Sequence, residues 1–143
     1  MAPLSPRRRR VLQAVLYEAI AVAVVAPVLT FVFDEPPLSS MLLTLTMSAI
    51  ATAWNFGFNA VFERWEARQA VKGRSWRRRV AHGVGFEVGL SLLLIPLMAL
   101  WMGISLWQAL VADAGLMLFF LCYTVVFTWG FDRVFGLPQS AQA

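Results

Sequence analysis

Residues 8–27 read RRRVLQAVLYEAIAVAVVAP, and residues 77–96 read RRRVAHGVGFEVGLSLLLIP. Both stretches begin with three arginines, carry a glutamate ten positions after the first of them, and end in a proline. The residues between these landmarks are mainly apolar, which is typical of a membrane helix that starts at a charged interface. Because the second stretch repeats the first 69 positions later, the pair also indicates an internal duplication.

The composition of the chain excludes an ordinary soluble domain. Of its 143 residues, 59% are hydrophobic and only 14% are charged, and the mean hydropathy is +0.68. Globular chains carry about a quarter charged residues, and a soluble protein this apolar could not cover its surface with polar groups. A soluble enzyme domain is therefore excluded. A disulfide-stapled secreted protein is excluded as well, because Cys122 is the single cysteine.

Three long apolar tracts lie between the arginine clusters. Residues 11–33 hold one charged residue, residues 38–62 hold none, and residues 80–131 hold two acidic residues. A helix needs about 20 apolar residues to cross a hydrocarbon core of about 30 Å, so the tracts supply one, one and two spans. None of them alternates polar and apolar residues, which argues against lipid-facing strands. We expect an all-α integral membrane protein with four transmembrane helices.

The duplication divides these helices into two tandem two-helix repeats. The offset of 69 positions also aligns Trp54 with Tyr123 and Phe58 with Phe127, without a gap. The predicted helices cover about residues 10–33 and 38–62 in a first transmembrane pair repeat (residues 1–69), and about residues 79–102 and 107–132 in a second (residues 70–143). Since each repeat has an even number of helices, the two copies should be parallel rather than inverted.

All twelve basic residues fall on one side of this predicted topology. They occupy the N-terminal tail, the central loop and the C-terminal tail, whereas the hairpins near residues 34–37 and 103–106 contain none. The positive-inside rule then places both termini of this multi-pass membrane protein in the cytoplasm. We interpret the basic clusters as topology signals and anionic-lipid contacts, with no nucleic-acid partner. The first apolar run is too long for a signal peptide and contains Glu18.

Glu18 is the main candidate for function. It lies eight residues beyond Arg10, or about 12 Å along a helix, so we expect it well inside the bilayer. An intramembrane carboxyl costs about 2.5–3.5 kcal/mol on insertion scales, and desolvation favours its protonated form. Such a group can hold a proton or a cation in turn, and this competition would couple cation export to proton entry.

Glu87 occupies the matching position of the second repeat. Two interpretations stay open: a second carboxyl for proton and substrate coupling, or a packing residue. The second is favoured by Gly85 and Gly89, which are spaced for the close approach of another helix.

Further polar and aromatic residues are candidates for a substrate pathway or gate. They are Tyr17, Trp54, Asn55, Asn59, Phe62, Glu63, His82, Asp113, Tyr123 and Asp132. Each has a plainer interpretation as well. His82 could relay protons or form an interfacial hydrogen bond, the asparagines and helix-end acids could join helices, and Asp113 could pair or lie in a wet position near the hairpin. The sequence contains no metal-ligand cluster and no nucleophile–base pair, so we expect no metal, no cofactor and no enzyme activity.

These residues resemble the motifs of the proteobacterial antimicrobial compound efflux family, whose members contain two tandem bacterial transmembrane pair domains. The helix-one motif R-x-x-H-A-x-x-[FY]-E is matched by Arg10, Ala14, Tyr17 and Glu18, with Gln13 in place of histidine. Its helix-three counterpart is matched by Arg79, His82, Phe86 and Glu87, with Gly83 in place of alanine.

The other two motifs are also similar. The pattern W-N-x-x-[FY]-N-x-x-F-[DE] is matched by Trp54, Asn55, Phe58, Asn59, Phe62 and Glu63. The last motif is matched by Asp113, Tyr123, Phe127, Trp129, Phe131 and Asp132, with Thr128 in place of asparagine. The resemblance covers nearly the whole chain.

The resemblance implies proton-coupled efflux of cationic biocides such as chlorhexidine and acriflavine across the bacterial inner membrane. Short-chain diamines are implied as further substrates of some members. Glu18 matches the carboxylate of the family that is linked to both proton and substrate. The implied partners are protons, organic cations, the lipid bilayer and a second copy of the chain, which the charge bias requires to be a parallel homodimer.

Two alternatives remain. A small multidrug resistance transporter also has four helices and a helix-one glutamate, but insertion in both orientations requires a weak charge bias, which this chain does not have. A non-transporting membrane scaffold or sensor would use its polar residues only to join helices, and it would tolerate Glu18→Gln.

Overall fold

The computed structural model describes residues 4–71, 73 and 75–137. Its four helices are α1 (Pro6–Phe33), α2 (Pro37–Ala67), α3 (Trp76–Met102) and α4 (Leu106–Phe135). Each is long and apolar enough to cross a membrane. The predicted all-α fold with four membrane-spanning helices is therefore confirmed. The helices extend past the apolar tracts at the end where the arginines lie.

Both hairpin turns begin with a residue in the left-handed conformation. α1 ends at Asp34 with φ 56°, and α3 ends at Gly103 with φ 65°, both left-handed. These residues are 69 positions apart, and aspartate is among the few non-glycine residues that adopt this conformation readily. Ser105 then begins α4 with a capping box to Gln108, which satisfies two backbone N–H groups at the helix start.

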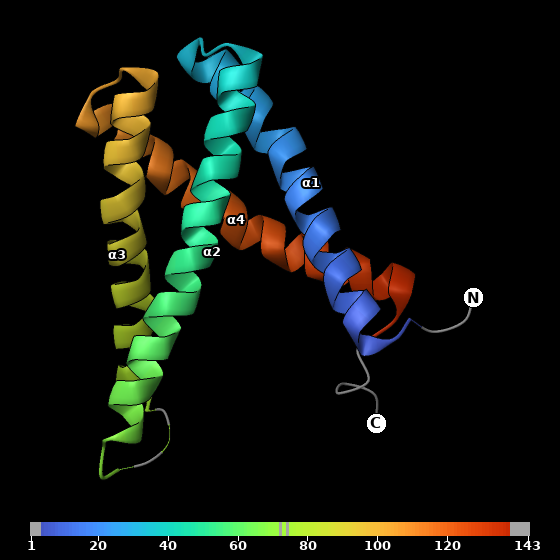
Figure 1. The fold of residues 1–143 in the computed structure, drawn as a ribbon, viewed down its shortest axis with the longest axis vertical. Coiled ribbons are helices and arrows are strands. Elements are labelled where there is room, and N and C mark those ends of the chain that lie inside the picture. Colours follow the sequence, from blue (N-terminus) through green and yellow to red (C-terminus); the bar gives the residue numbers. More distant parts are fainter. Residues whose placement is uncertain (1–3, 72, 74, 138–143) are drawn as a thin grey trace.

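The helices pair differently at the two ends of the molecule (Figure 1). We call the end with the turns after Phe33 and Met102 the hairpin end, and the end where α1 and α3 begin the arginine-rich end. α1 and α2 diverge from their turn, α3 stands beside α2, and α4 runs behind α2 toward the start of α1. The last turns of α4 meet the first turns of α1, where Arg9 pairs with Asp132.

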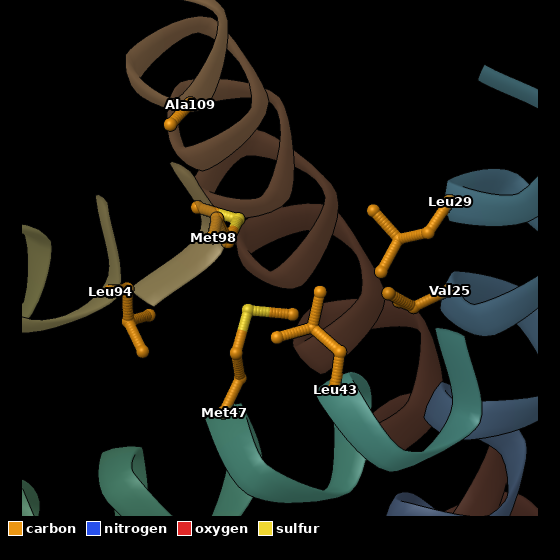
Figure 2. Packing of buried hydrophobic residues seen from close by; sticks show 7 residues of the cluster. All are labelled: Val25, Leu29, Leu43, Met47, Leu94, Met98 and Ala109. Atoms are coloured by element: carbon orange, nitrogen blue, oxygen red, sulfur yellow. The ribbon is translucent and has the colours of Figure 1, made fainter. Parts of the chain in front are cut away.

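The buried core lies in the hairpin half, where all four helices come together (Figure 2). Its members are Val25, Leu29, Leu43, Met47, Leu94, Met98 and Ala109. Outside this cluster many large apolar side chains point outward; Phe31 and Leu100 are 87% and 85% exposed. Such a surface is suited to lipid acyl chains rather than to water.

α2 and α3 approach closely in the arginine-rich half through two glycines. A Cβ atom on Gly89 would overlap the Trp54 ring, at 2.6 Å from Cη2, and one on Gly85 would lie 3.2 Å from Phe58 Cζ. The aromatic side chains of α2 thus pack directly on the backbone of α3. This is the close approach that the spacing of these glycines predicts.

We expect Gly89→Ala to destabilise the protein by about 1–3 kcal/mol, the usual cost of overpacking a filled space. The Trp54 ring cannot bend away from the new methyl group and must leave its position. The thermal unfolding temperature of the purified protein in detergent measures this change. Gly83→Ala is the matched control, because no atom lies within 4 Å of a Cβ there. Equal unfolding temperatures for the two variants would contradict the packing described.

Candidate functional site

Glu18 lies between α1 and α2, half-buried, and its carboxylate has a defined partner. Ser48 Oγ donates a hydrogen bond of 2.6 Å to Glu18 Oε2, which is in the range of charge-assisted hydrogen bonds to a carboxylate. Ser48 was not among the predicted site residues. The only sequence signal for it is its place in a series of hydroxyl residues spaced by four in the uncharged tract of α2, namely Ser40, Thr44 and Ser48.

The turn of α1 that carries Glu18 is also held by α4. Tyr123 Oη donates a hydrogen bond of 2.8 Å to the backbone carbonyl of Tyr17, and the Tyr17 hydroxyl lies 2.9 Å from Thr124 Oγ1. The two tyrosine rings are 4.8 Å apart, and Phe127 packs edge-on at 5.3 Å from Tyr17. Tyr123 is also near enough to Glu18 for electrostatic interaction. Glu18 on α1 therefore lies near groups from two other helices, α2 and α4.

The second repeat contains an equivalent of this contact. Trp54 Nε1 donates a hydrogen bond of 3.0 Å to the backbone carbonyl of Phe86. Trp54 and Tyr123 are 69 positions apart, and so are Tyr17 and Phe86. In each case the second helix of one repeat binds the carbonyl group just before the glutamate of the other repeat. The α2–α3 and α4–α1 interfaces are thus related by the duplication.

His82, Asn59 and Asn55 form a second link between α2 and α3. Asn59 Nδ2 donates to the Asn55 carbonyl at 2.8 Å and to Asn55 Oδ1 at 2.6 Å. This fixes the amide so that Asn59 Oδ1 faces His82 Nε2 at 2.6 Å, and Nε2 must carry the hydrogen because an amide oxygen only accepts. The imidazole also packs against Phe58 and Phe62, at 5.2 and 4.7 Å between ring centres.

A third group joins α3 to α4. Asp113 is only 6% exposed, and Ser91 Oγ donates a hydrogen bond of 2.6 Å to its Oδ2. Glu87, one helical turn before Ser91, is near enough to Asp113 for electrostatic interaction. The alternative of a wet position for Asp113 near the hairpin is therefore wrong. The sequence missed Ser91 for the same reason that it missed Ser48.

An ion pair closes the α4–α1 interface at the arginine-rich end. Arg9 Nη2 lies 2.6 Å from Asp132 Oδ1, and these side chains are 12% and 24% exposed. The same guanidinium lies over the Phe131 ring at 4.8 Å. The equivalent arginine, Arg78, instead lies over Trp65. Within the described residues, no ion pair involves Glu63.

The predicted candidates therefore form separate groups rather than one site. Glu18, Tyr17 and Tyr123 meet between α1, α2 and α4, and Glu87 and Asp113 meet between α3 and α4. The link between α2 and α3 consists of Trp54, Asn55, Asn59, Phe62 and His82. In the ranges that the structure describes, no group of three or more histidine, cysteine or acidic residues could hold a metal ion.

Comparisons with known proteins agree with this duplicated architecture. The sequence model of the chlorhexidine efflux transporter family matches twice, over residues 5–68 and 74–137, and the two matches start 69 residues apart (74 − 5). No solved structure matches the chain significantly.

Three curated relatives are each named "Short-chain diamines transporter". The protein from Acinetobacter baylyi is 39% identical over 127 residues, which cover 89% of each chain. The Vibrio parahaemolyticus protein is 33% identical over 128 residues, covering 90% of this chain and 91% of the relative. The Acinetobacter baumannii protein is 33% identical over 131 residues, covering 89% and 88%.

The fold and these matches define a multi-pass membrane protein of the efflux transporter class. More specifically, the chain belongs to the chlorhexidine efflux transporter family, built from two repeats. The family predicted from the four motifs is confirmed. Membership of a transporter family is consistent with the expectation that the chain is not an enzyme.

The two residues that depart from the motifs, Gln13 and Thr128, occupy the positions equivalent to His82 and Asn59, which are hydrogen-bonded to each other. Gln13 is 69 positions before His82, and Thr128 is 69 positions after Asn59. The α2–α3 interface therefore keeps the histidine–asparagine hydrogen bond, whereas the α4–α1 interface has replaced both partners. As a result, only the second repeat has an imidazole at this level.

We expect Arg9 and Asp132 to be energetically coupled, because both are largely shielded from water and hydrogen-bonded to each other. Asp132→Asn should lower the free energy of unfolding by about 1–3 kcal/mol, less than the loss at fully buried pairs. A double-mutant cycle with Arg9→Gln, read by thermal unfolding in detergent, isolates the pair. Glu63→Gln, at the equivalent position, is the control and should be nearly neutral. An absence of coupling in the cycle would contradict the shielded ion pair.

Proposed function

We propose that this protein exports organic cations in exchange for protons and that the Glu18 carboxyl holds either the proton or the cation. The observation that carries the proposal is the position of Glu18 inside a membrane-spanning helix, bonded to Ser48 and facing Tyr123. A carboxyl at this depth is costly, so its presence there indicates a function. Family membership identifies the protein as an efflux transporter, and we assign the exchange of proton for cation to the Glu18 carboxyl.

The substrates that we propose share one chemistry: positively charged nitrogen on an apolar body or spacer. Chlorhexidine, after which the family is named, acriflavine and short-chain diamines, after which the relatives are named, all fit it. The rings of Tyr17, Tyr123 and Phe127 pack on one another at the turn of α1 that carries Glu18, and Tyr123 interacts electrostatically with it. Aromatic faces attract cations once water is excluded, so these rings would support the carboxylate in binding a substrate.

We propose that both termini lie in the cytoplasm and that the protein works in the inner membrane. The support is the distribution of charge along the sequence, since all twelve basic residues lie in the N-terminal tail, the central loop with its flanks and the C-terminal tail, and none lies in either hairpin. In this orientation a cation enters at the arginine-rich end and leaves at the hairpin end. If the functional unit is a homodimer, its two copies are then parallel.

The membrane potential limits the exchange ratio. Moving one positive charge outward against 100 mV costs about 2.3 kcal/mol, and exchange of one proton for a dication leaves one charge uncompensated. Two protons balance a dication. We therefore propose that dications require two carboxyls, either Glu18 with Glu87 or two copies of Glu18 across a dimer.

We assign the remaining candidates to the pathway and its closure. Trp54 and Tyr123, which bind equivalent carbonyls, together with the Asn55–Asn59–His82 link, would control separation of the α2–α3 and α4–α1 interfaces. Phe62 packs on His82 and belongs to the same gate. Asp132 would close α4 on α1 from the arginine-rich end, with Glu63 at the equivalent position. Asp113, in the hairpin half of α4, would take part in substrate release.

Glu18→Gln should reduce substrate-triggered proton release from energised inverted membrane vesicles by at least tenfold, because glutamine keeps the hydrogen bond from Ser48 but cannot exchange a proton. Chlorhexidine, acriflavine and a short-chain diamine are tested separately, with equal amounts of folded protein. Ser48→Ala is the companion variant and should retain part of the exchange. A fully active Glu18→Gln protein would contradict the proposal and favour a scaffold or sensor role.

Transport of a diamine should be electroneutral. In proteoliposomes with a pH gradient and a potassium–valinomycin clamp, its rate should stay constant when the membrane potential is set to zero or to 100 mV. The reason is that two protons balance the two charges of the substrate. A rate that changes with potential in the sense of one proton per dication would contradict the two-carboxyl exchange.

A further inference from the structure

A groove of about 610 Å³ runs along α3 in the arginine-rich half. Its lining comes from residues between Val80 and Val88, with Asn55 of α2 at its edge. Sites for small molecules have volumes of about 300–1,000 Å³. The groove therefore has room for a small organic ligand.

The lining combines apolar walls with one carboxylate. Val80, Val84, Val88 and Phe86 supply apolar surface. Among the described residues the lining contains no arginine or lysine, and its imidazole, His82, is hydrogen-bonded to Asn59. Glu87 lines it too, and in the part of the chain that is described no group donates a hydrogen bond to this carboxylate. A negative charge between apolar walls complements a cation that carries apolar groups.

Two neighbours strengthen this complementarity. Asp113 lies close enough to Glu87 for the two acidic groups to repel each other, and a cation bound beside them would offset this repulsion. Phe86 is held in place because its carbonyl accepts from Trp54 and its ring packs edge-on against Phe58 at 5.8 Å. A fixed ring beside a carboxylate offers both parts of a cation site, charge and an aromatic surface.

The first repeat does not have this combination. Its hollow of about 500 Å³ is lined by Val11 and Val15, the equivalents of Val80 and Val84, but also by Arg7 and Arg8. Glu18 lines neither hollow, and its carboxylate instead accepts from Ser48. Guanidinium groups repel a cation, so the two equivalent positions have diverged in charge.

We propose that the groove lined by Glu87 is the site where an amphipathic organic cation first binds, from the arginine-rich side, before it reaches Glu18. This inference rests on the proposed function and assigns different roles to the two glutamates. Glu87 captures the cation at the groove, and Glu18, hydrogen-bonded to Ser48 and near Tyr123, exchanges it for a proton.

Binding of acriflavine to the full-length protein in lipid nanodiscs, followed by fluorescence anisotropy, tests the proposal. Glu87→Gln should weaken binding at least tenfold by removing the anchoring charge. Gly83→Leu should do the same by filling the groove, which Gly83 lines. Gly57→Leu is the matched control: neither glycine has an atom within 4 Å of a Cβ, but Gly57 is on α2 and outside the lining, so its affinity should equal that of the wild type.

A second measurement covers the case in which Gly83→Leu does not fold. Cys122 is first replaced (Cys122→Ser), and Val84→Cys then introduces a single cysteine into the groove. Acriflavine or a short-chain diamine should slow alkylation of this cysteine at least fivefold. Alkylation of Gly57→Cys should not change. Protection of both cysteines, or of neither, overturns the proposal.

The outcomes separate this inference from the proposed function. Wild-type proton exchange together with unchanged binding in Glu87→Gln and Gly83→Leu overturns the groove alone. Loss of binding in only one of these variants also overturns it, because the cation would then use the charge without the groove, or the groove would hold an acyl chain or a second copy. No binding and no exchange by the wild type overturns both proposals.

Discussion

Glu18 carries a carboxyl within an apolar membrane-spanning helix, where it needs a polar partner, and the hydrogen bond from Ser48 supplies one. The arrangement of the helices brings this partner to it. α2 supplies the hydroxyl, and α4 crosses behind α2 to hold the adjacent turn of α1 through Tyr123. A carboxyl facing lipid would have no polar partner, which would cost several kcal/mol. α2 thus gives the carboxyl a polar partner, and α4 places a tyrosine near it.

Duplication explains most of the architecture, and divergence explains its asymmetry. Both repeats keep a left-handed turn at the hairpin end, and both receive a hydrogen bond on the carbonyl before the glutamate. The repeats differ in the polar and charged residues at their interfaces. The α4–α1 interface has the Arg9–Asp132 pair, whereas the α2–α3 interface has His82 bonded to Asn59 and the glycines that admit Trp54. A transporter made of equivalent halves can thus give each half a different task.

Much of the fold could be predicted from the sequence because hydropathy, arginine position and the 69-residue offset each depend on local pattern. Glu18 was predictable for the same reason, as a charge inside an apolar tract. Its partner Ser48 was not, because hydroxyl residues occur on more than one side of α2, and their positions in the sequence do not show which face points to α1. The burial of Asp113 and the path of α4 depend likewise on how whole helices cross. Crossing follows from packing of Trp54 on Gly89 and Tyr123 on Tyr17, contacts between residues that are far apart in sequence.

The central claim is that one carboxyl, Glu18, holds a proton and an organic cation in turn. The most direct measurement is infrared difference spectroscopy of the protein in lipid on addition of a short-chain diamine. The account predicts loss of a protonated-carboxyl C=O band, gain of carboxylate bands and release of the proton to the medium, all absent in Glu18→Gln. Binding of the diamine without a change in the carboxyl bands, or the same change in Glu18→Gln, would contradict it.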